Sequence, residues 1–269
     1  MRLPPRLTHR APVVIGGTGG SGTRALQRAL AAAGVFMGAR VNESGDAMDF
    51  EPFLDEAINP ILSHTGSLDY RLADLPPGLA GRLRPAFGRA LAAYVRERPW
   101  RGAWGWKNPR SMYILPVILD RCPGLRFVHL VRDGRDMALS SNQNQPRKHY
   151  AALFGRAYPE GRPEASIELW ARTNLEAAAW CRRRLGGRYR LIRFEDLCAD
   201  PAGTLAGLLL WLGAGRAGAS GVARATAGIA APASMGRWRS LDPARLAGLE
   251  AAGAEALARF GYPLASAKA

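Results

Sequence analysis

Residues 13–30 read "VVIGGTGGSGTRALQRAL", and the fold can be predicted from them outward. It places a hydrophobic run, a glycine-rich turn and a helical pattern one after another. The glycines allow backbone N–H groups to approach an anion, and the positive end of the following helix adds unpaired donors. Thr23 and Arg24 stand where a nucleotide-hydrolysing P-loop has its lysine and Ser/Thr. The stretch therefore predicts a phosphate or sulfate site without a P-loop lysine. The loop residues predicted to hold the anion are Gly19, Gly20, Ser21, Gly22, Thr23 and Arg24.

Strands and helices alternate along the rest of the chain. Short apolar runs that end in turn residues predict strands at 13–17, 103–106, 126–131 and 189–194. Helical patterns predict helices at 22–33, 112–121, 134–143, 164–185 and 201–212. The alternation predicts an α/β fold, in which a P-loop-like parallel sheet is covered by helices on both faces. Ligands of such sheets bind at the carboxyl ends of the strands.

The domain organisation follows from length and composition. A chain of 269 residues can bury the core of one large domain, so 1–269 is interpreted as a single domain. Residues 1–11 are basic and are interpreted as a flexible leader. Segments 35–99 and 143–163 carry proline, glycine and charge without a strand pattern, and we expect them to be insertions that roof the acceptor side of the site.

The net charge of +15 permits anionic ligands. It comes from arginines scattered along the chain, and no aromatic-basic motif or zinc-finger spacing predicts nucleic acid as a partner. Three widely spaced cysteines suit a reducing cytoplasm and make no metal site. The longest apolar runs are too short to span a membrane.

A second stretch, "FVHLVRDGRDMALSSNQ" (127–143), predicts another anion contact. Arg132 follows a buried strand, and Ser140 lies eight positions later, about two turns into the expected helix. An arginine fork and a hydroxyl so placed can hold one phosphate. In the alternative interpretation, Arg132 and Asp133 form a surface ion pair and Ser140 is an ordinary helical residue.

Together the two stretches resemble the nucleotide-binding signatures of the sulfotransferase superfamily, whose members use 3′-phosphoadenosine 5′-phosphosulfate (PAPS). The resemblance implies that Ser21-Gly22-Thr23 holds the 5′-phosphosulfate and that Arg132 and Ser140 hold the 3′-phosphate.

Two later stretches extend the resemblance. "RLIRFEDLCADPAGTLAGLLLWLG" (190–213) is similar to the family's Tyr-Glu-Asp-Leu block, with Phe194 in the tyrosine place. "SMGRWRSL" (234–241) resembles the late basic loop that folds over the cofactor, which makes Arg237 and Arg239 candidate ligands. In all, the resemblance covers about residues 13–262.

One departure from the family concerns the catalytic cation. Many members carry Lys or Arg immediately before Ser-Gly-Thr, where it supports the leaving oxygen, and here that residue is Gly20. "WGWKNPRS" (104–111) resembles the context of the catalytic lysine in tyrosylprotein sulfotransferases, so Lys107 is the candidate substitute. Arg24 and Arg110 are the fallback candidates for this role.

The catalytic base is predicted among acids beyond the loop. The cytosolic small-molecule enzymes use a histidine two places after the lysine position, where this chain has Pro109. The tyrosylprotein type uses a glutamate roughly twenty residues beyond the loop, which points to Glu43 or, next, Asp46. Asn42 is placed to orient either acid, and His64 is a weaker candidate for the base.

The resemblance thus implies a cytoplasmic, bacterial-type sulfotransferase that uses PAPS as co-substrate and no metal. The expected acceptor is a hydroxyl of a glycan or small molecule, and lipid, peptide tyrosine and phenolic acceptors stay open. Because Gly20 replaces the usual lysine or arginine, a second interpretation stays open: a degenerate protein of this fold that binds adenosine bisphosphate or a polyanion without catalysis. A P-loop kinase and a basic nucleic-acid-binding protein are weaker hypotheses, and the sequence sets no oligomeric state.

Overall fold

The computed structural model describes residues 11–98, 102–214 and 218–265. Its described part contains one parallel sheet of four strands in the order β2-β1-β3-β4. The strands are β1 (Val13–Gly16), β2 (Gly105–Lys107), β3 (Arg126–Val131) and β4 (Tyr189–Arg193). The α/β class and the four strands are confirmed. The predicted strand 103–106 is shifted to β2, so Lys107 closes the strand instead of following it.

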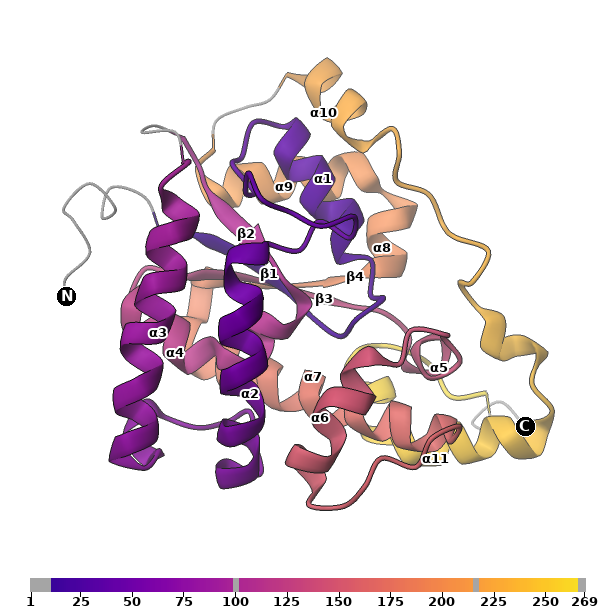
Figure 1. The fold of residues 1–269 in the computed structure, drawn as a ribbon. Helices are drawn as coiled ribbons and strands as arrows, with labels where there is room; N and C mark the ends of the chain where they lie inside the picture. Colours follow the sequence, from indigo (N-terminus) through magenta and orange to yellow (C-terminus); the bar gives the residue numbers. More distant parts are fainter. Residues whose placement is uncertain (1–10, 99–101, 215–217, 266–269) are drawn as a thin grey trace.

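Alternation along the strands divides the core between the two faces of the sheet. Val14 pairs with Trp106 and Phe127, and these three side chains belong to one buried cluster. Val13 and Ile15 point to the other face, where a separate cluster forms. Helices therefore cover both faces, as Figure 1 shows.

The helices sort by face. The Val14 face is covered by α2 (Glu51–Thr65), α3 (Pro77–Val95), α4 (Leu115–Arg121), α6 (Asn144–Phe154) and α7 (Pro163–Leu185). The opposite face is covered by α1 (Thr23–Ala32), α8 (Phe194–Ala199), α9 (Pro201–Leu212) and α10 (Ala219–Thr226). A third cluster joins α5 (Gly134–Ala138), α7 and α11 (Pro243–Arg259). No helix in these described ranges has the length and apolar character needed to cross a lipid bilayer.

Segment 35–99 contributes to the core as well as to the site. Its helices α2 and α3 bury Leu54, Ile58 and Phe87 in the same cluster as Trp106. Phe50 stacks on Trp106, with ring centroids 4.6 Å apart. The segment is therefore part of the hydrophobic core on the Val14 face, which its proline and charge content did not indicate. Trp100 lies outside the described residues.

The helix predicted at 134–143 is wrong at its end, since α5 stops at Ala138. The side chains of Ser140 and Asn142 each accept a hydrogen bond from the backbone N–H two residues on, at 3.2 and 3.3 Å. Gln143 Nε2 donates to the Ser140 carbonyl at 2.6 Å. Such side-chain bonds compete with the helical ladder, so Ser140 lies in a turn between α5 and α6.

Candidate functional site

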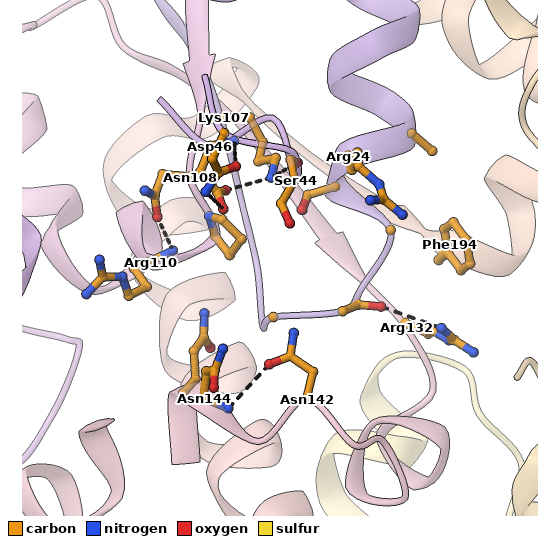
Figure 2. Close-up of a pocket in the computed structure, with 18 of the residues that line it drawn as sticks. Arg24, Ser44, Asp46, Lys107, Asn108, Arg110, Arg132, Asn142, Asn144 and Phe194 are labelled. Carbon is orange, nitrogen blue, oxygen red and sulfur yellow. Dashed lines mark hydrogen bonds and ion pairs between the residues drawn. The ribbon is translucent and has the colours of Figure 1, made fainter. Parts of the chain in front are cut away.

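A cavity of about 600 Å³ opens at the carboxyl edge of the sheet. The glycine loop after β1, the ends of β2 and β3, segment 42–51 and the start of α6 all border it. Figure 2 shows two ends with the Lys107–Asp46 pair between them. The Arg132 end comprises Arg24, Arg132, Phe194 and Ser234. The Arg110 end comprises Glu51, Asn108, Arg110, Asn144 and Lys148, and Asn142 borders the cavity beside Gly19 of the glycine loop.

The glycine loop is shaped by two backbone conformations that favour glycine. Gly20 has φ 93° and Gly22 has φ 89°. A Cβ on Gly22 would overlap the Phe194 ring, so the loop can pack against the start of α8 only with glycine at this position. The φ of Gly20 favours glycine over the lysine or arginine that many family members carry there. Ser21 is fully buried, and its hydroxyl donates to the Thr18 carbonyl at 2.6 Å. This hydrogen bond stabilises the loop, and Ser21 itself does not border the cavity.

We expect Gly22→Ala to lower the free energy of unfolding by about 1–3 kcal/mol more than Gly34→Ala does. Both glycines have nearly the same φ, 89° and 87°, but a Cβ on Gly34 would have no described atom within 4 Å. The conformational cost of the substitution is therefore shared by both variants, and the difference between their losses measures the clash with Phe194. Urea unfolding measures both. Equal losses, or no recovery when Phe194→Ala is added to Gly22→Ala, would contradict the prediction.

Arg24 is the cation with an open guanidinium in this cavity. It is exposed, it lines the cavity, and the described residues offer it no hydrogen-bond or ion-pair partner. Figure 2 shows it beside the glycine loop, on the same side as Phe194. An anion in the loop would therefore find backbone N–H groups and an unpaired arginine together.

Lys107 is buried at the centre of the cavity wall. Its Nζ donates to the Asp46 carboxylate and to the Ser44 carbonyl, both at 2.6 Å. Burial lowers the pKa of Lys107, the Asp46 carboxylate partly restores it, and the charge of Arg24 lowers it again. An ammonium has three N–H donors, so two acceptors leave one N–H for a ligand oxygen.

The structure separates the two candidate bases. Asp46 borders the cavity, and its second carboxylate oxygen accepts from Asn42 Nδ2 at 3.3 Å. Glu43 is exposed and does not border the cavity. His64 is also exposed and away from the lining, 3.3 Å from the Asp74 carbonyl. Of the predicted bases, Asp46 alone meets both Lys107 and the cavity.

Arg132 stands at the end of β3, as predicted, and is 6% exposed. It donates to Ser234 Oγ at 3.1 Å and lies 3.6 Å from the Asp136 carboxylate. Its Nε is buried without a partner among the described residues. Its guanidinium lies 5.4 Å from the centre of the Phe194 ring. Arg132 is thus fixed by contacts with Ser234 and Asp136, and its Nε–H forms no hydrogen bond within the described residues.

Ser140, predicted to hold the 3′-phosphate, and Arg237 and Arg239, predicted to bind the cofactor, do not border the cavity. Arg237 donates to the carbonyls of Leu139 and Ser234, at 3.0 and 3.1 Å. Arg239 is exposed over Trp238. Ser140 is half-buried in its turn. Their roles stay predictions that require the loop around 234–240 to move toward a ligand.

Asp136 is a buried carboxylate beside Arg132 that was not among the residues predicted from the sequence. It is 1% exposed and accepts from the backbone N–H of Gly236 at 2.6 Å and of Trp238 at 3.4 Å. The same carboxylate faces Arg132, so it holds the late basic loop beside the strand-end arginine. The i, i+4 spacing of Arg132 and Asp136 was the available signal.

The Arg110 end is organised by a second set of charges. Arg110 donates to Glu51 and Asp55, both at 2.6 Å, and Lys148 lies 3.0 Å from Asp55. Asn108 Nδ2 donates to the other oxygen of Glu51 at 2.6 Å. Burial raises the pKa of Asp55, but hydrogen bonds from Arg110 and Lys148 outweigh it and hold this pKa below its usual value. Arg110 is thus committed to carboxylates and is not a free cation.

No cluster of three or more His, Cys, Asp or Glu side chains suited to a metal ion occurs in the part of the chain that the structure describes. The site therefore consists of a glycine loop, an open arginine, a buried lysine–aspartate pair and a strand-end arginine. Such a set can bind a doubly charged anion at the loop, and it can move a proton at Asp46 while Lys107 supports developing negative charge.

A family model described as "Sulfotransferase family" matches residues 12–216, which include the loop, Lys107 and Arg132 but not the stretch 234–241. No curated protein sequence matches the chain.

Solved structures share the fold at low identity. The sulfotransferase domain of the Synechococcus PCC 7002 olefin synthase is 17% identical, with a TM-score of 0.57 over 98% of this chain and 99% of that chain. The sulfotransferase domain from the curacin biosynthetic pathway is 15% identical, with a TM-score of 0.55 over 98% and 100%. A sulfotransferase from Alicyclobacillus acidocaldarius is 14% identical, with a TM-score of 0.51 over 97% and 100%.

Proposed function

The chain belongs to the sulfotransferase family, and we propose that it transfers a sulfuryl group from PAPS to an acceptor hydroxyl and releases adenosine 3′,5′-bisphosphate. The observation that carries the proposal is the position of the buried Lys107–Asp46 pair between a glycine loop with an open arginine and a polar chamber. The two substrates would meet at this pair, with the donor at the Arg132 end and the acceptor at the Arg110 end.

The Arg132 end supplies the contacts that PAPS requires. Backbone N–H groups of the loop and the start of α1 would bind the 5′-phosphosulfate, and Arg24 would neutralise its charge. Arg132, which borders the cavity at the end of β3, would receive the 3′-phosphate. The Phe194 ring, which lies between Gly22 and Arg132, offers a flat apolar face for the nucleoside.

The chemical step follows from the central pair. The acceptor oxygen forms a bond to sulfur, and the bond between sulfur and the bridging oxygen breaks. The electron pair of that bond stays on the leaving phosphate, where the Lys107 ammonium stabilises it. The acceptor proton goes to the Asp46 carboxylate. Lys107 and Asp46 touch each other, so the same contact that orients the base brings the cation to the leaving group.

The proposal is tested by calorimetric titration of the purified protein with adenosine 3′,5′-bisphosphate and, separately, 5′-AMP. We expect the bisphosphate to bind at least about tenfold more tightly, since one additional charged hydrogen bond contributes about 1.5–3 kcal/mol. Equal affinities would overturn the assignment of a PAPS site. Tight bisphosphate binding without any transfer of labelled sulfate from PAPS would favour the degenerate binding protein.

A further inference from the structure

We infer that the acceptor is a neutral, polyhydroxylated compound, such as a sugar or sugar chain without charged groups. The inference rests on the proposed function and names the acceptor class that the Arg110 end fits. It excludes apolar alcohols and phenols as preferred acceptors, and it also excludes acidic glycans, which the net charge of +15 would suggest.

The first argument is the chemistry of the lining. The apolar residues that border the cavity are Ala25, Pro109, Phe194, Ala230 and Pro232. Among the described residues, only Pro109 belongs to a segment of the Arg110 end, where the remaining lining side chains are amides and charged groups. An apolar acceptor there would cover these groups without replacing their hydrogen bonds to water, which costs free energy for each unpaired group.

The two cations that border the cavity at the Arg110 end, Arg110 and Lys148, are paired with carboxylates. Glu51 borders the cavity as well, and Asp55 pairs with both cations from outside the lining. Both cations already contact carboxylates, and Arg24, the open cation, lies beside the phosphosulfate loop. An acidic glycan would therefore meet cations that are already paired with carboxylates, so its negative charge would gain little binding free energy there.

Two side-chain amides that border the cavity have unused hydrogen-bonding groups among the described residues. The Asn144 side chain and Asn142 Nδ2 have no hydrogen-bond partner among the residues that the structure describes, and both side chains border the cavity. Figure 2 shows the two amides together, across the cavity from Asn108. A hydroxyl donates one hydrogen bond and accepts two, and an amide both donates and accepts, so paired amides suit neighbouring hydroxyls of one ring.

The test measures transfer of labelled sulfate from PAPS to four probes: maltotriose, an oligogalacturonate of similar length, p-nitrophenol and decanol. We expect kcat/KM to be highest for maltotriose, by about tenfold or more, which corresponds to about 1.4 kcal/mol. A tenfold preference for any of the other three probes overturns the inference. Transfer to none of them also overturns it, provided that the same preparation binds adenosine 3′,5′-bisphosphate. Failure of that binding instead contradicts the proposed function.

A pair of variants tests the amides directly. Asn144→Leu keeps the size of the side chain and removes its hydrogen bonds, so we expect KM for maltotriose to rise about tenfold with little change in kcat or in bisphosphate affinity. Ala151→Leu adds the same side chain to the same helix at an exposed position that does not border the cavity. An unchanged KM in Asn144→Leu, or an equal rise in Ala151→Leu, would contradict the role of the amide.

Discussion

Lys107→Met is expected to lower kcat by about 10²- to 10³-fold, the loss typical of removing one preorganised group that stabilises charge in the transition state. Methionine replaces the buried alkyl part of the lysine side chain and lacks only the terminal nitrogen position, so the fold should be retained. The affinity for adenosine 3′,5′-bisphosphate should change much less, because Lys107 is already paired with Asp46 before any ligand binds. Single-turnover transfer from PAPS and calorimetry measure the two quantities.

The pH dependence of kcat gives a second signature of Lys107. Burial lowers the pKa of this ammonium from its usual value of 10.5. The protonated form is the one that stabilises the leaving phosphate, so activity should be lost as the pH rises through the lowered pKa. The alkaline limb of the profile is therefore expected below pH 10.5. It should be absent in Lys107→Arg, because a guanidinium does not deprotonate in this range.

Arg24→Met is the comparison that separates the two cations of the cavity. Arg24 has no partner in the described residues and faces the loop, so its removal should weaken bisphosphate binding and raise KM for PAPS. A larger loss of kcat in Arg24→Met than in Lys107→Met would transfer the catalytic role to Arg24. Retention of kcat in Lys107→Met would leave Lys107 as a structural partner of Asp46.

The sequence predicted the parts of this site that lie within single stretches. The glycine loop and the strand-end Arg132 are predictable because a hydrophobic run precedes each of them and fixes its place on the sheet. Lys107 follows from the resemblance of residues 104–111 to the context of a catalytic lysine. Ser140 was misplaced because its hydroxyl and the Asn142 amide bond to nearby backbone and end α5 early. Helical periodicity does not register that competition.

Contacts between distant segments were beyond the reach of the sequence. Asp46 and Glu43 looked alike as acids beyond the loop, and only the fold shows that Asp46 reaches Lys107 across 61 positions. The Glu51–Arg110 pair joins residues 59 positions apart in the same way. Spacing along one chain does not specify which of several acids meets a given cation in space. Asp136 could not be predicted for a similar reason. Its hydrogen-bond donors are backbone N–H groups, and the residue types in the sequence do not indicate which backbone groups a carboxylate will meet.

Arg132→Ala is expected to weaken binding of adenosine 3′,5′-bisphosphate by about 10- to 100-fold, the value of one or two charged hydrogen bonds to phosphate. The affinity for 5′-AMP should stay nearly constant, because Arg132 stands at the end assigned to the 3′-phosphate. The structural cost should be small for a buried arginine. Asp136 keeps the backbone N–H groups of Gly236 and Trp238 as donors, so its carboxylate is not left without partners.

Two further variants decide whether Arg132 binds the ligand or holds the loop that covers it. Arg147→Ala removes an exposed arginine of α6 that pairs with Glu160 and does not border the cavity, so it controls for the loss of one positive charge. Ser234→Ala removes the hydroxyl that Arg132 contacts at 3.1 Å and leaves the guanidinium in place. If Ser234→Ala matched the loss in Arg132→Ala, or if AMP binding fell in parallel, Arg132 would act through the loop. If only Arg132→Ala weakens binding, and only binding of adenosine 3′,5′-bisphosphate is weakened, Arg132 contacts the 3′-phosphate directly. The 3′-phosphate is the group that the bisphosphate has and 5′-AMP lacks, so such a pattern reports the interaction between this phosphate and the arginine.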